Sequence, residues 1–359
     1  MKIIFFQPRT HNNICDFLKE LSINDDIEIY SYENNAPVSS KKIYYEKLKS
    51  FKTFKKEHLN IPNPFFMWKK ITSYKIITFK TLGSITTVIG VIICKMKRIK
   101  PVIFVQGVYT ETKTFKGKLL RFFFKYLVRN SILISATKVG YMESLELTKN
   151  SYYLPFCIYC NKGLYLTDKI NSNTMLCVSK IERRKNLMPI FEAFNLLVEN
   201  DSYCKNANLI LASREVKDKL YFAELKLFIK EKNLGDRIKI YINVGRLKMN
   251  ELYAKSAFFI LASNDEPAAV SHLEAARYGI PLLINTFNGT FDYFIEGKHC
   301  VLLNSIQKED IYKGMIELRK YNSIEVRKSI HQYVAAKFDP SDSVKKFKLI
   351  LKNEKKILQ

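Results

Sequence analysis

The sequence predicts an α/β protein in which two domains are each built on a parallel sheet. A chain of 359 residues is long enough for two domains of ordinary size. A hydrophobic content of 47% with mixed charge is typical of a globular protein. Short apolar runs alternate with segments of helical spacing, and this order of strand and helix is the unit of a parallel α/β sheet.

The first half of the chain shows this alternation from its first residues. The predicted strands are residues 2–6, 27–30, 74–79, 101–105 and 132–135. The predicted helices are residues 14–21, 82–96, 116–129 and 138–145. The apolar window at 82–94 is too short to span a bilayer, so we interpret it as part of a buried helix.

The second half continues the pattern after a turn-rich stretch at 157–172, where we expect the linker. The predicted strands are residues 174–178, 208–212, 238–242, 258–262, 281–285 and 300–303. The first predicted helix begins at Asn186, which is a favourable N-cap. The other predicted helices are residues 216–232, 309–319 and 324–337.

The stretch from residue 258 to 285 organises the second half. The turn residues Ser263-Asn264-Asp265 end its first strand. Pro267 suits the first turn of a helix, because its missing N–H costs little there. Gly279 suits the left-handed position after a helix, and Pro281 prevents its continuation. The expected order is strand, loop, helix and strand.

Two glutamates in this stretch are candidates for ligand binding. Glu266 lies in the loop, and Glu274 follows eight residues later, two turns into the expected helix. Backbone N–H groups at Ala268, Ala269 and Val270 would face a phosphate resting on the helix start. The alternative interpretation is that both glutamates are solvated charges on the helix surface.

The residues of this stretch resemble a known family. The matching positions are Glu266, Pro267, Glu274, Ala275, Gly279 and Pro281. They resemble the E-x7-E region of retaining glycosyltransferases with the GT-B fold, the glycosyltransferase family 4 (group 1) type. Ala268 and Ala269 stand where that family commonly has Phe and Gly. The resemblance implies two Rossmann-like, doubly wound parallel-sheet domains that face an interdomain cleft.

Domain boundaries follow from the linker and the resemblance together. We expect an acceptor-side domain at 1–165 and a nucleotide-sugar-binding domain at 166–337. The lysine-rich tail at 338–359 resembles the last helix of the family, which crosses back to the first domain.

A basic loop after the strand at 174–178 strengthens the resemblance. By itself, the run from Ser179 to Lys185 is most simply a basic surface loop. In the family, a basic pair at this place grips the donor diphosphate, and Lys180 and Lys185 stand at its two positions. The two downstream glutamates at family-like spacing favour this functional interpretation over the surface loop.

The resemblance implies a role for each candidate residue. Lys180 and Lys185 would hold the diphosphate together with the N–H groups of residues 268–270, Glu266 would contact the donor sugar, and Glu274 would accept hydrogen bonds from ribose. Thr290, which follows Gly289, is a further candidate for donor phosphate or sugar. Arg9 and Gln106 are candidates on the acceptor side. Gln106 cannot titrate, so we assign it no proton transfer.

The expected chemistry uses fixed charges and no metal. The sequence shows neither an Asp-x-Asp motif nor a histidine cluster, so cations and N–H groups are expected to stabilise the leaving diphosphate without a cofactor. The family implies retention at the anomeric carbon, with the departing phosphate taking the acceptor proton.

The net charge of +25 favours anionic partners. Two basic segments, 41–58 and 116–129, have interleaved aromatic residues. We interpret 41–58 first as a solvated, partly helical insertion, and 116–129 equally well as an ordinary core helix. Contact with an anionic membrane surface is the alternative for both segments. A nucleic-acid partner is not expected, because no supporting motif accompanies the charge.

The sequence therefore predicts a hexosyltransferase-type enzyme. It would move a sugar from a nucleotide-diphosphate sugar to a growing cell-surface polysaccharide or lipid-linked oligosaccharide, such as lipopolysaccharide, O-antigen or capsule. We expect it in the cytoplasm, peripheral on the inner face of the plasma membrane. Two alternatives stay open: a catalytically degenerate anion- or nucleotide-binding protein of the same fold, and a GT-B phosphorylase or epimerase.

Overall fold

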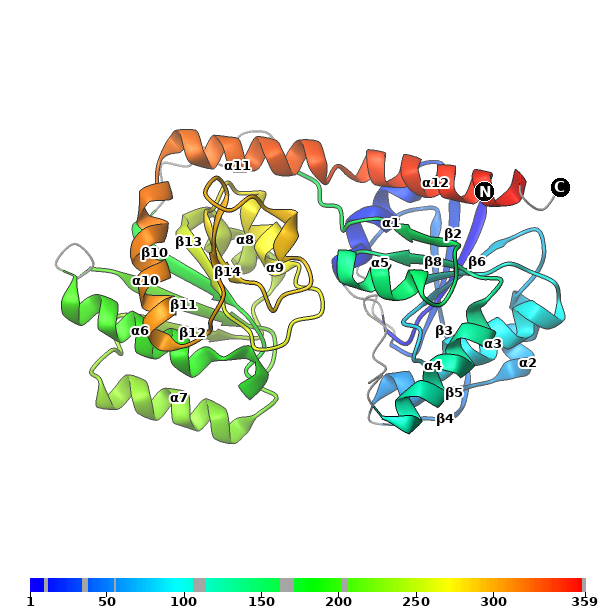
Figure 1. Cartoon of the computed structure of the whole chain (residues 1–359), viewed down its shortest axis with the longest axis horizontal. Coiled ribbons are helices and arrows are strands. Elements are labelled where there is room, and N and C mark those ends of the chain that lie inside the picture. Colours follow the sequence, from blue (N-terminus) through cyan, green and yellow to red (C-terminus); the bar gives the residue numbers. More distant parts are fainter. Residues whose placement is uncertain are drawn as a thin grey trace. The chain divides into compact units, whose positions relative to one another are not determined.

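The computed structural model describes residues 1–9, 12–33, 38–54, 56–105, 114–161, 171–201 and 206–356. The chain divides into two compact units, one formed by Met1–Cys157 with Pro340–Gln359 and the other by Ile158–Asp339 (Figure 1). Each unit has its own parallel sheet, which explains the alternation of strand and helix along the sequence.

The first unit is built on a seven-stranded sheet in the order β3-β2-β1-β6-β7-β8-β9, in which every neighbouring pair is parallel. The strands are β1 (Lys2–Phe6), β2 (Asp26–Ser31), β3 (Ile43–Lys47), β6 (Ile76–Lys80), β7 (Val102–Val105), β8 (Ile132–Ser135) and β9 (Ser151–Tyr153). The strand order changes direction between β1 and β6, which makes this the switch point of the sheet.

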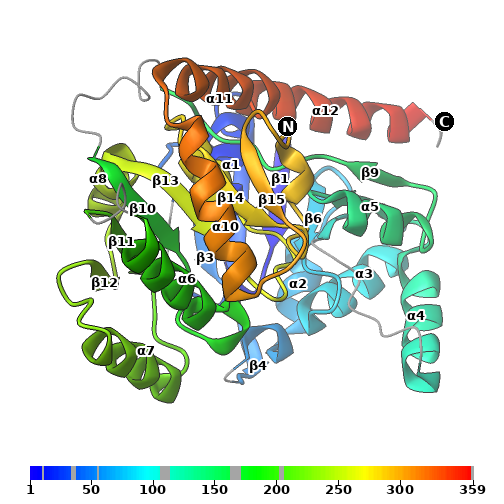
Figure 2. The ribbon, with the colours of Figure 1, turned by 60° about the vertical axis from the view of Figure 1, so that its left-hand side comes forward.

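Helices cover both faces of this sheet and bury two apolar cores. They are α1 (Cys15–Leu21), α2 (Pro64–Lys70), α3 (Ile85–Met96), α4 (Phe115–Val128), α5 (Lys138–Leu145) and α12 (Pro340–Lys356). The C-terminal α12 lies along α1, where Phe347 contacts the rings of Phe17 and Phe104 (Figures 1 and 2). Among the described residues, no helix has the length and apolarity needed to cross a membrane.

The segment 41–58 differs from its prediction, because its described residues form no α-helix. It contains β3, β4 (Ser50–Lys52) and the 3-10 turn η2 (Glu57–Leu59), and β4 pairs with β5 (Ile61–Pro62) in an antiparallel ribbon. Tyrosines and isoleucine at 43–45 favour an extended chain, and β2 offers them a pairing edge. The expectation of a partly helical insertion is therefore wrong.

The second unit has a six-stranded parallel sheet in the order β12-β11-β10-β13-β14-β15, the doubly wound arrangement. Its strands are β10 (Asn171–Val178), β11 (Asn208–Ser213), β12 (Ile238–Ile242), β13 (Ser256–Leu261), β14 (Leu282–Asn285) and β15 (Cys300–Leu303). Its helices are α6 (Leu187–Asn200), α7 (Lys219–Glu231), α8 (Arg246–Lys255), α9 (Ser271–Ala276), α10 (Lys308–Leu318) and α11 (Ile324–Lys337).

One large core joins α6, α7 and α10 to one face of this sheet, while α8 and α9 pack against the strands from the other face. Figures 1 and 2 show α10 beside α6. Gly279 follows α9 with a φ of 71°, as its predicted left-handed position requires.

Two local predictions in this unit are wrong. The helix does not begin at Pro267 but at Ser271, because Glu266 pairs with the chain at Asn288 and holds the intervening residues in a loop. The Glu266 N–H donates to Phe287 O at 3.2 Å. Asn186 is not a side-chain N-cap either: it takes a left-handed conformation, and its Nδ2 donates to Ile306 O at 2.9 Å.

Candidate functional site

A pocket of about 240 Å³ lies in the second unit, where the direction of the strand order changes between β10 and β13. In open parallel sheets, ligands bind outside the carboxyl ends of the strands at this switch point. The pocket is lined by Val178, Ser179, Lys180, Lys185, Arg214, Leu261, Glu266, Ala268, Ala269, Val270 and Ser271. Six of the eight predicted donor-site residues are in this set, so the structure brings them together.

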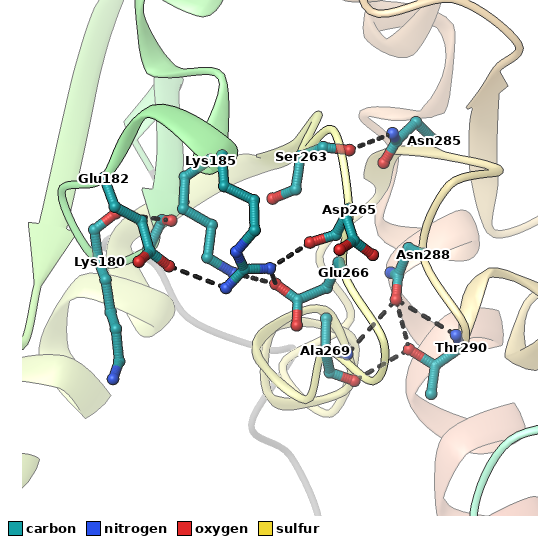
Figure 3. A network of polar contacts seen from close by, with 12 residues as sticks. Lys180, Glu182, Lys185, Ser263, Asp265, Glu266, Ala269, Asn285, Asn288 and Thr290 are labelled. Atoms are coloured by element: carbon teal, nitrogen blue, oxygen red, sulfur yellow. Dashed lines mark hydrogen bonds and ion pairs between the residues drawn. The ribbon is translucent and has the colours of Figure 1, made fainter. Parts of the chain in front are cut away.

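Lys185 and Glu266 form an ion pair at the centre of the site (Figure 3). Lys185 ends the 3-10 turn η3 (Arg183–Lys185) after β10, and only 8% of its surface is exposed. The Nη1 of Arg184 lies 3.7 Å from Glu266 Oε2, and it also donates to the backbone oxygen of Asp265. Partial burial makes the contact between Lys185 and Glu266 stronger than a surface ion pair, because less water screens it.

Lys180 lies apart from this ion pair (Figure 3). Its Nζ is 2.5 Å from Glu215 Oε1, and both side chains are about one-third exposed, at 34% and 39%. Arg214 follows β11 and also lines the pocket. The wall of the pocket therefore has three cationic side chains, and Arg184, outside the lining, contacts Glu266 as well.

A buried side-chain amide adds to the backbone pairing of Glu266 in holding the loop 266–270 in place. Asn288 is fully buried, and its Oδ1 accepts hydrogen bonds from the N–H of Ala269 at 3.4 Å and of Thr290 at 3.2 Å. The Thr290 hydroxyl is also buried, 2.9 Å from Asn288 Oδ1 and 3.0 Å from Ala269 O (Figure 3). Thr290 therefore supports the pocket loop from behind and is not among the residues that line the pocket.

Glu274 lies on α9, outside the set of lining residues. Its Oε2 accepts a hydrogen bond of 2.9 Å from the hydroxyl of Tyr253, a buried residue at the end of α8. Burial, together with the neighbouring carboxylate, raises the pKa of Tyr253 well above its ordinary value. The phenol thus stays protonated and fixes the orientation of Glu274.

The two predicted acceptor-side residues are placed differently. Arg9 belongs to the first unit, where its Nε lies 3.3 Å from Glu33 Oε1. Gln106 lies outside the described residues. Within the described ranges, no group of three or more His, Cys, Asp or Glu residues is placed to hold a metal ion.

Sequence reasoning missed four residues that shape the site. Arg184 falls within the basic run from Ser179 to Lys185, where only the two lysines are candidates, and Arg214 is not among the candidates. Asn288 and Tyr253 act on the pocket or on Glu274 through hydrogen bonds that no spacing rule reveals. For Arg214, the available signal was its position directly after strand β11, and for Arg184 it was its place in the basic loop that follows β10.

The site has the chemistry of a diphosphate-binding pocket. Lysine and arginine donors and the backbone at 268–271 surround it, and charge-assisted hydrogen bonds to phosphate oxygens are the strongest that such donors make. Glu266 reaches the same space, and a carboxylate there can accept hydrogen bonds from hydroxyl groups of a ligand.

Comparison with known sequences agrees with this chemistry. Residues 167–337, nearly all of the second unit, match the model of the family described as glycosyl transferases group 1. Mannosylfructose-phosphate synthase of Agrobacterium fabrum is 23% identical over 159 residues, which are 43% of this chain and 34% of that protein. The chain thus matches about a third of the length of that relative.

Comparison with solved structures extends the likeness to both units. Anabaena HepE in complex with UDP-glucose has a TM-score of 0.78 at 14% identity, over 98% of this chain and 100% of that chain. The lipopolysaccharide outer core galactosyltransferase WaaB, in its apo form, has a TM-score of 0.68 at 13% identity, over 99% and 100%. Likeness at these identities shows the fold. Together with the family match, this shows that the second unit resembles the group 1 glycosyl transferases over residues 167–337 and that the chain has the GT-B fold.

Proposed function

We propose that the protein is a retaining glycosyltransferase that moves a sugar from a nucleoside diphosphate sugar to a glycan acceptor. The observation that carries this proposal is the pocket at the β10/β13 switch point, where Lys180, Lys185 and Arg214 meet Glu266. The pocket offers positive charge for a diphosphate and a carboxylate for a sugar.

The ion pair of Lys185 with Glu266 explains how donor binding begins. A donor diphosphate competes for the Lys185 ammonium, because two phosphates carry more negative charge than one carboxylate. Glu266 is then released toward the hydroxyl groups of the donor sugar, and Glu274, oriented by Tyr253, is the acceptor for ribose hydroxyls.

Transfer requires stabilisation of the leaving diphosphate as its charge develops. Lys180, Lys185 and the N–H groups at 268–270 supply this stabilisation from fixed positions, which costs no reorganisation during the reaction. In this proposal the enzyme needs neither a metal nor an organic cofactor. The departing phosphate takes the acceptor proton.

The donor and the acceptor are proposed from different features. HepE has been solved with UDP and with UDP-glucose, which makes UDP-sugars the first donors to screen. A growing cell-surface glycan, in the manner of the lipopolysaccharide core on which WaaB is named to act, is the proposed acceptor. The exposed apolar side chains of α4 and the basic segment 41–58 support a peripheral position on the inner face of the plasma membrane.

A donor screen with mass detection tests the proposed activity. Nucleotide sugars are offered with membrane-extracted glycan, with and without a chelator, and product formation is measured for the natural chain and Lys185→Ala. Loss of one preorganised donor to the leaving group lowers kcat by roughly 10²–10³-fold. Lys239→Ala, which removes an exposed surface lysine of the same unit, is the control and retains turnover.

The outcomes separate the proposal from its alternatives. Near-natural turnover by Lys185→Ala removes the role assigned to this residue. Consumption of the donor that depends on inorganic phosphate identifies a phosphorylase. Conversion of the donor in the absence of any acceptor identifies an epimerase. Nucleotide binding without any product identifies a catalytically degenerate binding protein.

A further inference from the structure

The first unit contains a second pocket, smaller and more apolar than the one in the second unit. It has a volume of about 50 Å³ and lies at the carboxyl ends of β6, β7 and β8. Its lining includes Asn13, Phe17, Lys80, Phe104 and Leu154. A cavity of roughly 10–15 Å³ on this kind of measure admits one water molecule, so this pocket admits a small polar group but no whole sugar.

Lys80 is the charged side chain in this apolar lining. It is the last residue of β6, beside the switch point of the first sheet, and only 5% of its surface is exposed. Its Nζ donates to Asn13 Oδ1 at 2.9 Å. Among the residues that the structure describes, no carboxylate lies within ion-pair distance of Lys80.

A buried ammonium without a counter-charge is unfavourable, because the apolar surroundings cannot replace its hydration. Burial lowers the pKa of Lys80 to about 7, and Cys15 on α1, the titratable neighbour that acts on it, offsets this effect in part. The amine of the unliganded protein is therefore only partly charged near neutral pH, and an anion bound beside it would favour the ammonium form.

The backbone beside Lys80 is also held in a costly conformation. Thr81 has a φ of 74°, which is rare for a β-branched residue. The Thr81 N–H donates to Phe104 O at 3.0 Å, and the hydroxyl of Thr87 donates to Thr81 O at 2.8 Å. Strain that the surrounding structure enforces in this way is concentrated at functional sites.

From the cavity, the uncompensated amine and the strained turn, we infer that this pocket binds the acidic group of an anionic ligand, a carboxylate or a phosphate. Under the proposed function, on which this assignment of the ligand rests, the acid belongs to the acceptor glycan. The Lys80 ammonium pairs with the anion, Asn13 orients the amine, and Phe17 and Phe104 form the apolar wall.

Calorimetric titration of the full chain tests this inference without any transfer reaction. The probes are sodium glucuronate for the carboxylate, glucose 6-phosphate for the phosphate, and glucose as the neutral control. At about pH 8, above the Lys80 pKa of about 7, the bound anion restores the ammonium. We expect uptake of nearly one proton per acid bound, measured from the binding enthalpy in two buffers of different ionisation enthalpy.

Two variants assign the uptake to this pocket. Lys80→Met removes the amine at similar volume, and it should fold because it replaces a buried charge by an apolar group; acid binding should weaken at least tenfold and lose its proton uptake. Lys185→Ala disrupts the pocket of the second unit and should bind the acids unchanged. Uptake that survives Lys80→Met, or acids that bind no better than glucose to the natural chain, overturns the inference, whatever the donor screen shows.

Discussion

Asn288 shows how one buried side chain shapes the pocket of the second unit. Its side-chain oxygen Oδ1 accepts hydrogen bonds from the N–H groups of both Ala269 and Thr290. Asn288 thereby joins the loop after β13 to the loop after β14. His272 packs against these loops, and burial lowers its pKa to about 3, so the imidazole is neutral at physiological pH. The pocket wall thus depends on uncharged hydrogen bonds behind it.

Replacing Asn288 by Ala should both destabilise the second unit and weaken nucleotide binding. The N–H of Ala269 and the Thr290 hydroxyl lose a buried acceptor, which costs about 1–3 kcal/mol in the free energy of unfolding. The released loop also presents its N–H groups to phosphate less well. Denaturant unfolding and UDP titration measure the two effects.

Asn285→Ala is the matched control for this change. Asn285 is buried at the end of β14, but its Nδ2 donates to Ser263 O at 2.6 Å and does not contact residue 269. Asn285→Ala should lower the free energy of unfolding about as much as Asn288→Ala does. It should reduce the affinity for UDP less than Asn288→Ala does. If both variants lose UDP affinity equally, Asn288 has no special part in shaping the loop.

At the scale of elements, α4 is the helix that departs most from an ordinary core helix. Six apolar residues of the predicted helix 116–129 have the spacing of one helix face: Leu119, Leu120, Phe123, Phe124, Leu127 and Val128. Only the last three of these are buried. Phe115, Leu119, Phe122 and Tyr126 are exposed by 60–84%. An exposed apolar face flanked by Lys118 and Lys125 has the composition of a helix that lies in a membrane interface.

Vesicle flotation tests this surface of α4. The chain should float with vesicles that contain phosphatidylglycerol at low salt, and less with neutral vesicles or at high salt, because anionic lipid attracts the lysines. The double variant Leu119→Ser/Phe122→Ser should bind at least tenfold more weakly, since burying one such side chain contributes about 1.5–3 kcal/mol.

Leu247→Ser is the control for the vesicle experiment. Leu247 on α8 in the second unit is 87% exposed, so its change tests for a general effect of surface hydrophobicity. Equal flotation of all variants, or no flotation of the natural chain at low salt, would contradict a membrane role for α4.

Elements with one dominant signal could be predicted closely from sequence. β12, β15, α5 and α11 have the predicted bounds. The two strands are short apolar runs, and the side chains of Thr137 and Ser323 cap the two helices. The prediction for the segment 41–58 failed because its many lysines obscured the alternation of residues expected for a strand. Ile43, Tyr44 and Tyr45 nevertheless favour an extended chain. α2 was missed although Asn63 caps it and Pro64 begins it, since seven residues show too little periodicity.

At the scale of the molecule, the two units differ in how far the sequence reveals their function. In the second unit, charged residue types at family-like spacing predicted Lys180, Lys185 and Glu266, and the structure places all three in one pocket. In the first unit, Lys80 has no motif around it. Its burial depends on side chains contributed by α1, β7 and the chain after β9, which only the folded structure brings together.

The central claim is that the pocket between β10 and β13 holds a nucleoside diphosphate by cations and backbone N–H groups. Hydrogen–deuterium exchange of the full chain with and without UDP tests it most directly. We expect protection of residues 179–186 and 266–274 in the natural chain and its loss in Lys185→Ala. Saturating UDP that protects neither segment, or protects them equally in the variant, would contradict the account.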